Sequence, residues 1–312
     1  MNPLPRLPLA CYRLTFRVAE PVRLPPYAGS AWRGVFGHAL KRLVCVTREP
    51  ACESCLLYRS CVYPYVFETP PDPAVGKLRK YTKAPHPFVL EPDLVQTGAL
   101  PAGAAVTLGV ILFGHGNRYL PYVLHALDQA SRRGVGRGAL HLEQVEQAAG
   151  GDNWRAIYAP GAALTPEPPQ VPPCPPCPDR CRLALETPLR LKQEGHNLTP
   201  ETFQFGTLFA NLLRRFSLLT AFHTDTPLET DFAGLTRAAR SLAVAAAPLR
   251  WHEWTRYSSR QDALLQMGGL LGEITLAGAD LSPFWPYLWL GQWTHAGKGT
   301  SMGLGKYRIE AA

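Results

Sequence analysis

The sequence YRLTFRV, residues 12–18, alternates leucine, phenylalanine and valine with polar side chains. A period of two is typical of a half-buried β-strand. Prolines between residues 21 and 26 end this strand, because proline cannot continue a hydrogen-bonded ladder. Residues 30–44 then carry apolar side chains at helical spacing after a serine that suits an N-cap. The chain therefore opens with a strand and an amphipathic helix.

The rest of the first half extends this pair to a complete unit. Residues 45–87 are rich in cysteine and proline, which indicates an insertion rather than core. Beyond the insertion the sequence predicts two strands, a second amphipathic helix and a last strand, at 88–91, 104–113, 119–130 and 139–145. The order β-α-β-β-α-β is that of the ferredoxin-like, or RRM-like, fold.

The second half repeats this order after a proline-rich stretch. Five prolines within residues 171–179 exclude a helix or a central strand there. Thr199-Pro200-Glu201 predicts a helix start, with an N-cap, a proline at the first position and an acid in the first turn. That helix is expected to run to about residue 222. Strands and a short helix or turn complete the unit, the strands at 182–191, 249–257, 264–276 and 304–309 and the helix at 284–293.

We therefore predict an α+β protein of two tandem ferredoxin-like domains. The first domain is expected at 1–165, with a Cys-rich insertion at about 45–87, and the second at 181–312. A proline-rich linker at 166–180 joins them. A length of 312 residues, of which 46% are hydrophobic, suits two globular domains of ordinary size.

The formal net charge of +8 favours an anionic partner, of which nucleic acid is the commonest. A merely basic globular protein is the alternative. No stretch reaches the about 18 apolar residues that span a bilayer, and the first residues lack the apolar core of a signal peptide. We therefore expect a cytoplasmic protein without a membrane partner, whose thiols stay reduced.

The segment GKGTSMGLGKY, residues 297–307, is the most informative about function. Glycine tolerates positive φ and lets a backbone approach a phosphate, so that successive N–H groups form an anion-binding concavity. Lysines add charge and hydroxyls add donors, so we predict sugar–phosphate contacts from Gly297, Lys298, Gly299, Thr300, Ser301, Gly303, Gly305 and Lys306. A P-loop and a dinucleotide-binding loop are excluded, because both precede a helix and this segment precedes a strand. The alternative is a tight turn without a ligand.

A second basic glycine segment occupies the equivalent place in the first half. RRGVGRG, residues 132–138, also lies between a helix and a last strand, and Arg133 and Arg137 are its candidate RNA contacts. Two such segments at equivalent points of a repeat support nucleic-acid binding better than one. The alternative is a basic helix end with a glycine cap.

Residues 297–307 before the final strand resemble the hallmark loop of the RAMP superfamily of CRISPR proteins. GSAWRGVFGHAL at 29–40, RYSSRQ at 256–261 and the run from Lys80-Tyr81 to Pro85-His86-Pro87-Phe88 point within it to the pre-crRNA-processing endoribonucleases, the Cas6 family. The resemblance spans nearly the whole chain. It implies tandem ferredoxin-like domains and a metal-independent endoribonuclease that cleaves CRISPR repeat RNA. The 2′-hydroxyl would attack the adjacent phosphate and leave 2′,3′-cyclic phosphate and 5′-hydroxyl ends.

The same resemblance implies His38 as the catalytic residue, with Tyr27 and Lys41 as helpers. Histidine titrates near neutral pH, lysine stabilises extra charge on a phosphorane, and positions 38 and 41 share a helix face. The alternative is a structural histidine on the helix. His295, beside the glycine segment 297–307, is the rival histidine, or else a residue that orders the turn.

Two further basic groups are candidate RNA contacts. Arg256, Tyr257 and Arg260 combine guanidinium groups with a stacking ring, although a solvated strand edge is equally compatible. A basic run consists of Lys77, Arg79, Lys80 and Lys83 around Tyr81. Such a run tracks phosphates or is simply solvated.

The insertion carries the pattern C-x6-C-x2-C-x5-C, formed by Cys45, Cys52, Cys55 and Cys61. Four thiols at this spacing suit a closed structural zinc site, and the spacing matches neither ferredoxin type of iron–sulfur site. Unligated cysteines are the alternative. Cys174, Cys177 and Cys181 in the linker are one ligand short of a closed site.

Three functions remain open from the sequence. The first is the endoribonuclease, which needs no cofactor for catalysis. The second is a non-catalytic RAMP subunit that binds guide RNA with the other subunits of a CRISPR effector complex. The third is a metal-binding scaffold or redox protein, against which the basic charge and the paired glycine segments argue.

Overall fold

The computed structural model describes residues 5–70, 84–136, 138–258, 263–278 and 280–311, except for the side chains of 256–258, 263–265 and 311. The chain folds as two compact units. The N-terminal unit comprises Leu7–Val171 with Phe222–Asp225, and the C-terminal unit is built mainly of Pro172–Ala221 and Thr226–Ala312. The polypeptide passes from the first unit to the second within the proline-rich stretch.

The main sheet of the N-terminal unit is antiparallel, with its strands in the order β3-β5-β1-β6-β7. Its first four strands and two helices follow the chain order β1, α1, β3, β5, α2 and β6, with bounds Leu9–Val18, Gly29–Val44, Phe88–Pro92, Ala105–Phe113, Leu120–Arg133 and Leu140–Gly150. This order and pairing are those of a ferredoxin-like unit. Strand β7, Asn153–Tyr158, extends the edge, and a two-stranded sheet pairs β2, Val22–Leu24, with β4, Gly98–Leu100.

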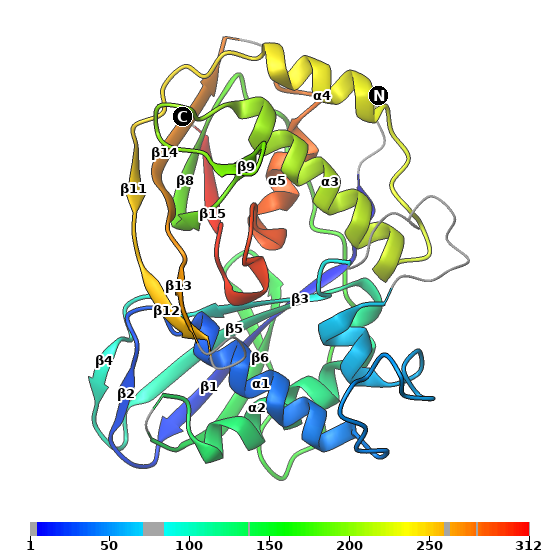
Figure 1. Cartoon of the computed structure of the whole chain (residues 1–312), viewed down its shortest axis with the longest axis vertical. Helices are drawn as coiled ribbons and strands as arrows, with labels where there is room; N and C mark the ends of the chain where they lie inside the picture. The colour runs from blue at the N-terminus through cyan, green and yellow to red at the C-terminus, as the bar shows by residue number, and fades with distance from the viewer. Residues whose placement is uncertain (1–4, 71–83, 137, 259–262, 279, 312) are drawn as a thin grey trace. The chain divides into compact units, whose positions relative to one another are not determined.

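Helices α1 and α2 lie side by side against this sheet (Figure 1). The apolar side chains of β1 point into the core, as their alternation predicts, and Phe16 lies 5.1 Å from Trp32 of α1 between ring centroids. Trp32, Phe36 and Leu40 of α1 are all buried in this core. The opposite face of α1 is therefore turned away from the core.

The C-terminal unit repeats the arrangement with a sheet in the order β11-β14-β8-β15. Its elements are β8, α3, β11, β14, α5 and β15, with bounds Arg180–Leu189, Phe205–His223, Leu249–His252, Gly269–Ala277, Trp285–Thr294 and Tyr307–Ala311. Between β11 and β14 the chain forms the hairpin of β12, Thr255–Ser258, and β13, Ala263–Gln266. The prediction of tandem ferredoxin-like folds is confirmed.

Several details differ from the sequence prediction. The helix predicted to start at Thr199 begins at Phe205, because Thr199 closes a turn with Thr202, whose hydroxyl lies 2.8 Å from the Thr199 amide. Helix α4, Phe232–Ser241, was not predicted, although Asp231 caps it through the Gly234 amide. The short hairpin of β9, Lys192–Gln193, and β10, His196–Asn197, was also missed.

The proline-rich stretch packs on α5 within the C-terminal unit. The indole N–H of Trp285 donates to the carbonyl of Pro175 at 2.7 Å, and that of Trp289 donates to Pro173 at 2.8 Å. The carbonyls of these two prolines thus accept hydrogen bonds from side chains and not from a neighbouring strand. None of the helices that the structure describes is both long and apolar enough to cross a bilayer.

Candidate functional site

The C-terminal glycine loop, residues 297–307, joins α5 to β15. Gly297, Gly299, Gly303 and Gly305 all have positive φ, at 78°, 80°, 86° and 71°. A Cβ at Gly305 would lie 1.8 Å from the carbonyl oxygen of Ala296, and one at Gly297 would lie 2.5 Å from that of Arg190. Glycine is thus needed here because the loop folds back onto the chain's own backbone.

Most of the loop's amides are used inside the protein. Their N–H groups donate at 2.7–3.1 Å to Asn211 Oδ1, Arg190 O, Pro188 O and Thr187 Oγ1, from Gly297, Lys298, Gly305 and Lys306 respectively. The Gly303 amide likewise donates to the Thr300 carbonyl at 2.8 Å, so the expected concavity of successive N–H groups is not formed at these five positions. Among the described residues, no partner is found for the N–H groups of Gly299 and Thr300 at the tip.

The loop's side chains divide in the same way. Thr300 and Ser301 are each only 7% exposed, so their hydroxyls are largely covered. Lys306 forms an ion pair with Glu186 at 3.5 Å. Lys298 is exposed at the tip, beside Gly299, which is half-buried.

Two cations that the sequence analysis missed lie near Lys298. Partial burial, and then the charges of Lys192 and Arg190, lower the pKa of Lys298 below its usual value. Arg190 is fixed by the Gln266 carbonyl at 2.9 Å, and Lys192 by the Gly195 carbonyl at 3.1 Å. The sequence Arg190-Leu191-Lys192 could have predicted this pair of cations. Successive side chains of an extended chain point to opposite sides, so burial of the leucine places both cations on the other side. The positive potential of the three groups favours an anion at the tip.

The rival histidine, His295, is fully buried in the neck of the loop. Its Nδ1 pairs with the carbonyl of Leu304 at 3.2 Å. Such a position orders the loop and offers no face to a substrate.

The N-terminal glycine loop, residues 132–138, connects α2 to β6. Gly134, Gly136 and Gly138 have positive φ, and a Cβ at Gly136 would lie 2.4 Å from the carbonyl oxygen of Arg23. Arg133 is exposed, whereas Arg137 lies outside the described residues. This loop therefore also uses glycine to approach the protein's own backbone.

His38 lies on the exposed face of α1, opposite Trp32 and Phe36. One turn earlier on the same face, a Cβ added at Gly34 would meet no atom of the described residues within 4 Å. By contrast, a Cβ at Gly37 would lie 3.1 Å from the Phe67 ring. The helix thus offers an open surface beside the His38 imidazole.

The two predicted helpers are placed differently. The Lys41 ammonium donates to the Pro50 carbonyl at 3.4 Å and lies 5.6 Å from the Tyr63 ring centroid, so it is directed to the Cys-rich segment. Tyr27 is half-buried, and burial, with the charge of Glu91 adding to it, raises the pKa of its phenol well above its usual value. Tyr27 therefore stays protonated near neutral pH, so that it cannot act as a general base but can donate a hydrogen bond. Among the described residues, no hydrogen bond joins His38 to Tyr27 or Lys41.

The remaining basic candidates fall largely outside the description. The side chains of Arg256 and Tyr257 in β12, and the whole of Arg260, lie outside the described residues, as does the run of Lys77, Arg79, Lys80, Tyr81 and Lys83.

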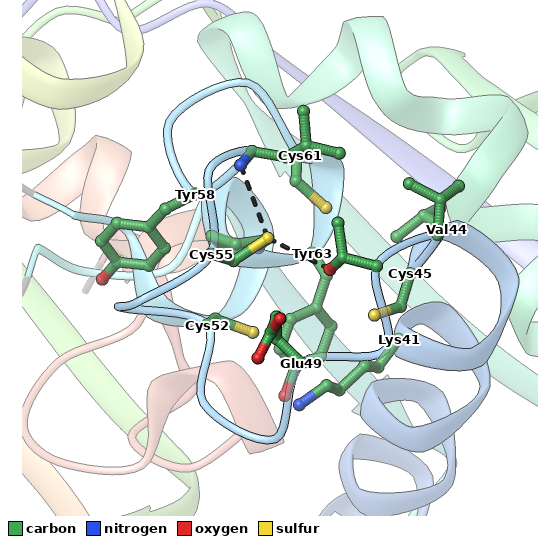
Figure 2. A pocket seen from close by; sticks show the side chains of 13 residues that line it. Lys41, Val44, Cys45, Glu49, Cys52, Cys55, Tyr58, Cys61 and Tyr63 are labelled. Carbon is green, nitrogen blue, oxygen red and sulfur yellow. Dashed lines mark hydrogen bonds between the residues drawn. The ribbon is translucent and has the colours of Figure 1, made fainter.

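The four cysteines of the insertion line one pocket (Figure 2), with Lys41, Glu49 and Tyr58 also on its wall. Burial, with Glu68 adding to it, raises the pKa of the Cys52 thiol to about 11. Within the described part of the chain, no group of three or more histidine, cysteine or acidic side chains is arranged to hold a metal ion. The geometry therefore does not support a preformed zinc site at Cys45, Cys52, Cys55 and Cys61.

The linker cysteines also form no such group. Cys174 and Cys177 are half-buried, and Cys181 is buried in β8 opposite Leu276 of β14 and Ala311 of β15.

Two family models match the chain. Residues 7–170 match AF_1859_N, described as an N-terminal domain. Residues 183–307 match CRISPR_Cas6, described as the CRISPR-associated endoribonuclease Cas6. The two matches meet at the passage between the two units.

A curated relative, an uncharacterized protein of Archaeoglobus fulgidus, is 27% identical over 124 residues. That match covers 39% of this chain and 41% of the relative, so less than half of its length is matched.

Solved structures with a similar fold include a Cas6 product complex, with a TM-score of 0.55 and 20% identity over 97% of this chain and all of that one. Cas6 of Thermus thermophilus matches with a TM-score of 0.51 and 16% identity, over 97% of this chain and 99% of that one. A chain of a partial Cas6-RT-Cas1–Cas2 complex matches with a TM-score of 0.57 and 13% identity, over 99% of this chain and 47% of that one. At these identities the likeness shows the fold.

Proposed function

The chain belongs to the RAMP-like Cas6 family of CRISPR-associated endoribonucleases, with an AF_1859_N domain at residues 7–170, and we propose on this basis that it binds CRISPR repeat RNA and cuts pre-crRNA within the repeats. The observation that carries the proposal is the exposed histidine on the open face of α1, His38. We place the protein in the cytoplasm, where such transcripts are made.

The proposed reaction is a metal-independent transesterification. His38 takes the proton of the ribose 2′-hydroxyl, whose oxygen then attacks the adjacent phosphorus. The bond from phosphorus to the 5′-oxygen breaks, and that oxygen takes a proton from water, while the proton on His38 is released to solvent. The products are a 2′,3′-cyclic phosphate and a 5′-hydroxyl.

The helpers contribute unequally in this proposal. The protonated Tyr27 phenol can donate a hydrogen bond to a phosphate oxygen as charge develops. Lys41 would first have to leave Pro50 and Tyr63. We therefore place the chemistry on His38 and Tyr27, and we assign Lys41 of α1 to contacts with the Cys-rich segment, residues 45–61.

Binding is proposed at the tip of the C-terminal glycine loop. Lys298 is exposed there with Arg190 and Lys192 nearby, and the amide of the neighbouring, half-buried Gly299 has no partner among the described residues. This grip is smaller than a loop of free amides would give, and its strength comes mainly from cations.

The experiment compares the wild-type protein with His38→Ala on repeat RNA in EDTA. We expect the variant to cleave about 10²–10⁴-fold more slowly at unchanged RNA affinity. His125→Ala is the matched control, because His125 is exposed on α2 of the same unit. A substrate with a 2′-deoxyribose at the scissile position should resist cleavage.

Two outcomes would contradict the proposal. Wild-type protein that binds repeat RNA without cutting it would favour a non-catalytic RAMP subunit that works with other effector-complex subunits. A His38→Ala variant that cuts at the wild-type rate would remove His38 from the chemistry.

A further inference from the structure

The Cys-rich segment, residues 45–61, lacks a hydrophobic core of its own. None of its residues is buried. Two of its large apolar side chains, Val46 and Leu56, are 75% and 86% exposed. Apolar burial therefore does not hold this segment in place.

The thiols, by contrast, gather on one side. Cys45, Cys52, Cys55 and Cys61 are half-buried, and all four line the same pocket (Figure 2). A segment that turns apolar side chains to solvent and its four cysteines inward is organised around sulfur. Such an arrangement is typical of small metal-stabilised modules.

The surroundings of the thiols also suit a bound cation. The hydroxyl of Thr47 lies 3.2 Å from Cys55 Sγ, and the amide of Leu57 donates to the same sulfur at 3.4 Å. Donors of this kind orient a ligand sulfur in metal sites. Glu68 lies close to Cys52, and one of its carboxylate oxygens, Oε2, is buried without a hydrogen-bond partner among the described residues. A nearby cation would offset the cost of burying that oxygen.

We propose that the Cys-rich segment binds one zinc ion through Cys45, Cys52, Cys55 and Cys61. Four thiolates suit zinc and close its tetrahedral shell, so the ion would stabilise the segment and take no part in catalysis. Because no ligand group is preassembled in the described structure, binding requires the loops to close around the ion. A chain stretch without a buried residue can make that movement at little cost in packing.

Lys41 gains a role from this proposal. Four thiolates around one divalent ion leave a net negative charge, and the Lys41 ammonium lies on the pocket wall. Its charge would offset part of that excess. This role explains why Lys41 points to the segment and not to the open face of α1.

The test measures metal directly on the full-length protein and does not depend on RNA cleavage. We expect elemental analysis of the purified protein to find about one zinc per chain. After chelation, Co²⁺ should bind at the same stoichiometry with thiolate-to-cobalt charge-transfer bands. Cys52→Ser and Cys55→Ser should lose the ion, whereas Cys174→Ser and Cys177→Ser, which lie outside the pocket, should keep it.

The cobalt titration keeps the proposal open to refutation even where a cysteine variant fails to fold. No Co²⁺ uptake by the chelated wild-type protein would overturn the proposal. Stoichiometric iron, or a disulfide between pocket cysteines in the protein purified under reducing conditions, would overturn it as well. Zinc lost equally from the linker variants would place the ion elsewhere.

Discussion

The two glycine loops occupy the same position in two units of the same topology, yet they differ in the basic side chains that the structure describes. In the N-terminal loop, glycines approach the backbone of residues 21–23, and the loop closes against β2. In the C-terminal loop, Gly297 and Gly305 approach Arg190 and Ala296 in the same way. Only the C-terminal loop carries a described lysine at its tip, with two further cations nearby.

A glycine in a loop can therefore have either of two roles: it lets the backbone approach a ligand, or it lets the backbone approach the protein itself. Glycine spacing predicts where the backbone must adopt positive φ or pass close to another strand. It does not say whether the neighbour is a phosphate or the protein itself. In both loops the neighbour is mostly the protein, so the ligand is indicated by the side chains at the tip.

The largest effect is expected from alanine substitutions at the glycines that lie against the backbone of another residue. Gly305→Ala would place a methyl group 1.8 Å from the Ala296 carbonyl oxygen, and Gly136→Ala would place one 2.4 Å from that of Arg23. Backbone atoms cannot move aside as side-chain ends can, so each variant should lose about 3 kcal/mol or more of stability in urea unfolding. Gly299→Ala is the control, because its nearest atoms are the ends of the Leu304 and Met302 side chains. It should cost about 1 kcal/mol, from its positive φ.

If Gly136→Ala destabilises the protein as expected and Gly305→Ala does not, the two loops do not use their glycines in the same way. The C-terminal loop would then be open enough to cradle a ligand along its whole length.

A smaller effect should separate the tips of the two loops. Lys298→Ala removes a charge that lies beside Arg190 and Lys192, whereas Arg133→Ala removes an exposed charge from the N-terminal loop. We expect Lys298→Ala to weaken binding of repeat RNA about threefold to tenfold and to reduce the slope of log affinity against log salt by about one. Titrations at several salt concentrations give both quantities. Equal losses in the two variants would mean that both loops grip the RNA.

The fold could be predicted from the sequence because its signals are local. The alternation in β1 and the helical spacing in α1 follow from which side chains face the core. The start of α3 was misplaced because one residue type serves two local structures: Thr199 closes a turn as readily as it caps a helix. Helix α4 had a capping aspartate and apolar residues at 232, 235 and 239, so its signal was present in the sequence.

The site was less predictable, because it depends on which amides and charged side chains already have hydrogen-bond partners within the fold. No local pattern shows that Asn211 of α3 takes the Gly297 amide, or that Pro50 and Tyr63 hold Lys41. These partners lie outside the motifs that named the residues. The exposure of His38 could be predicted, because Trp32, Phe36 and Leu40 fix the buried face of the helix.

The smallest effect concerns a glycine in the first helix of each unit. The two helices differ in what lies next to that glycine. Gly34 of α1 borders open space, whereas a Cβ at Gly206 of α3 would lie 3.0 Å from the Cα of Arg240 in α4. Alanine is favoured over glycine inside a helix by up to about 1 kcal/mol. Gly34→Ala should therefore raise the free energy of unfolding by that amount, and Gly206→Ala should lower it.

Gly34 costs stability and has no neighbour among the described residues, which is expected where a ligand needs the space. Gly34 lies one helical turn from His38, so a methyl group there would displace an RNA strand that passes close to the imidazole. We expect Gly34→Ala to be more stable and slower to cleave, with single-turnover rates reporting the loss. A variant that gains stability and keeps its full cleavage rate would show that the RNA approaches His38 from the other side. The glycine at position 34 would then not be needed to make room for a ligand.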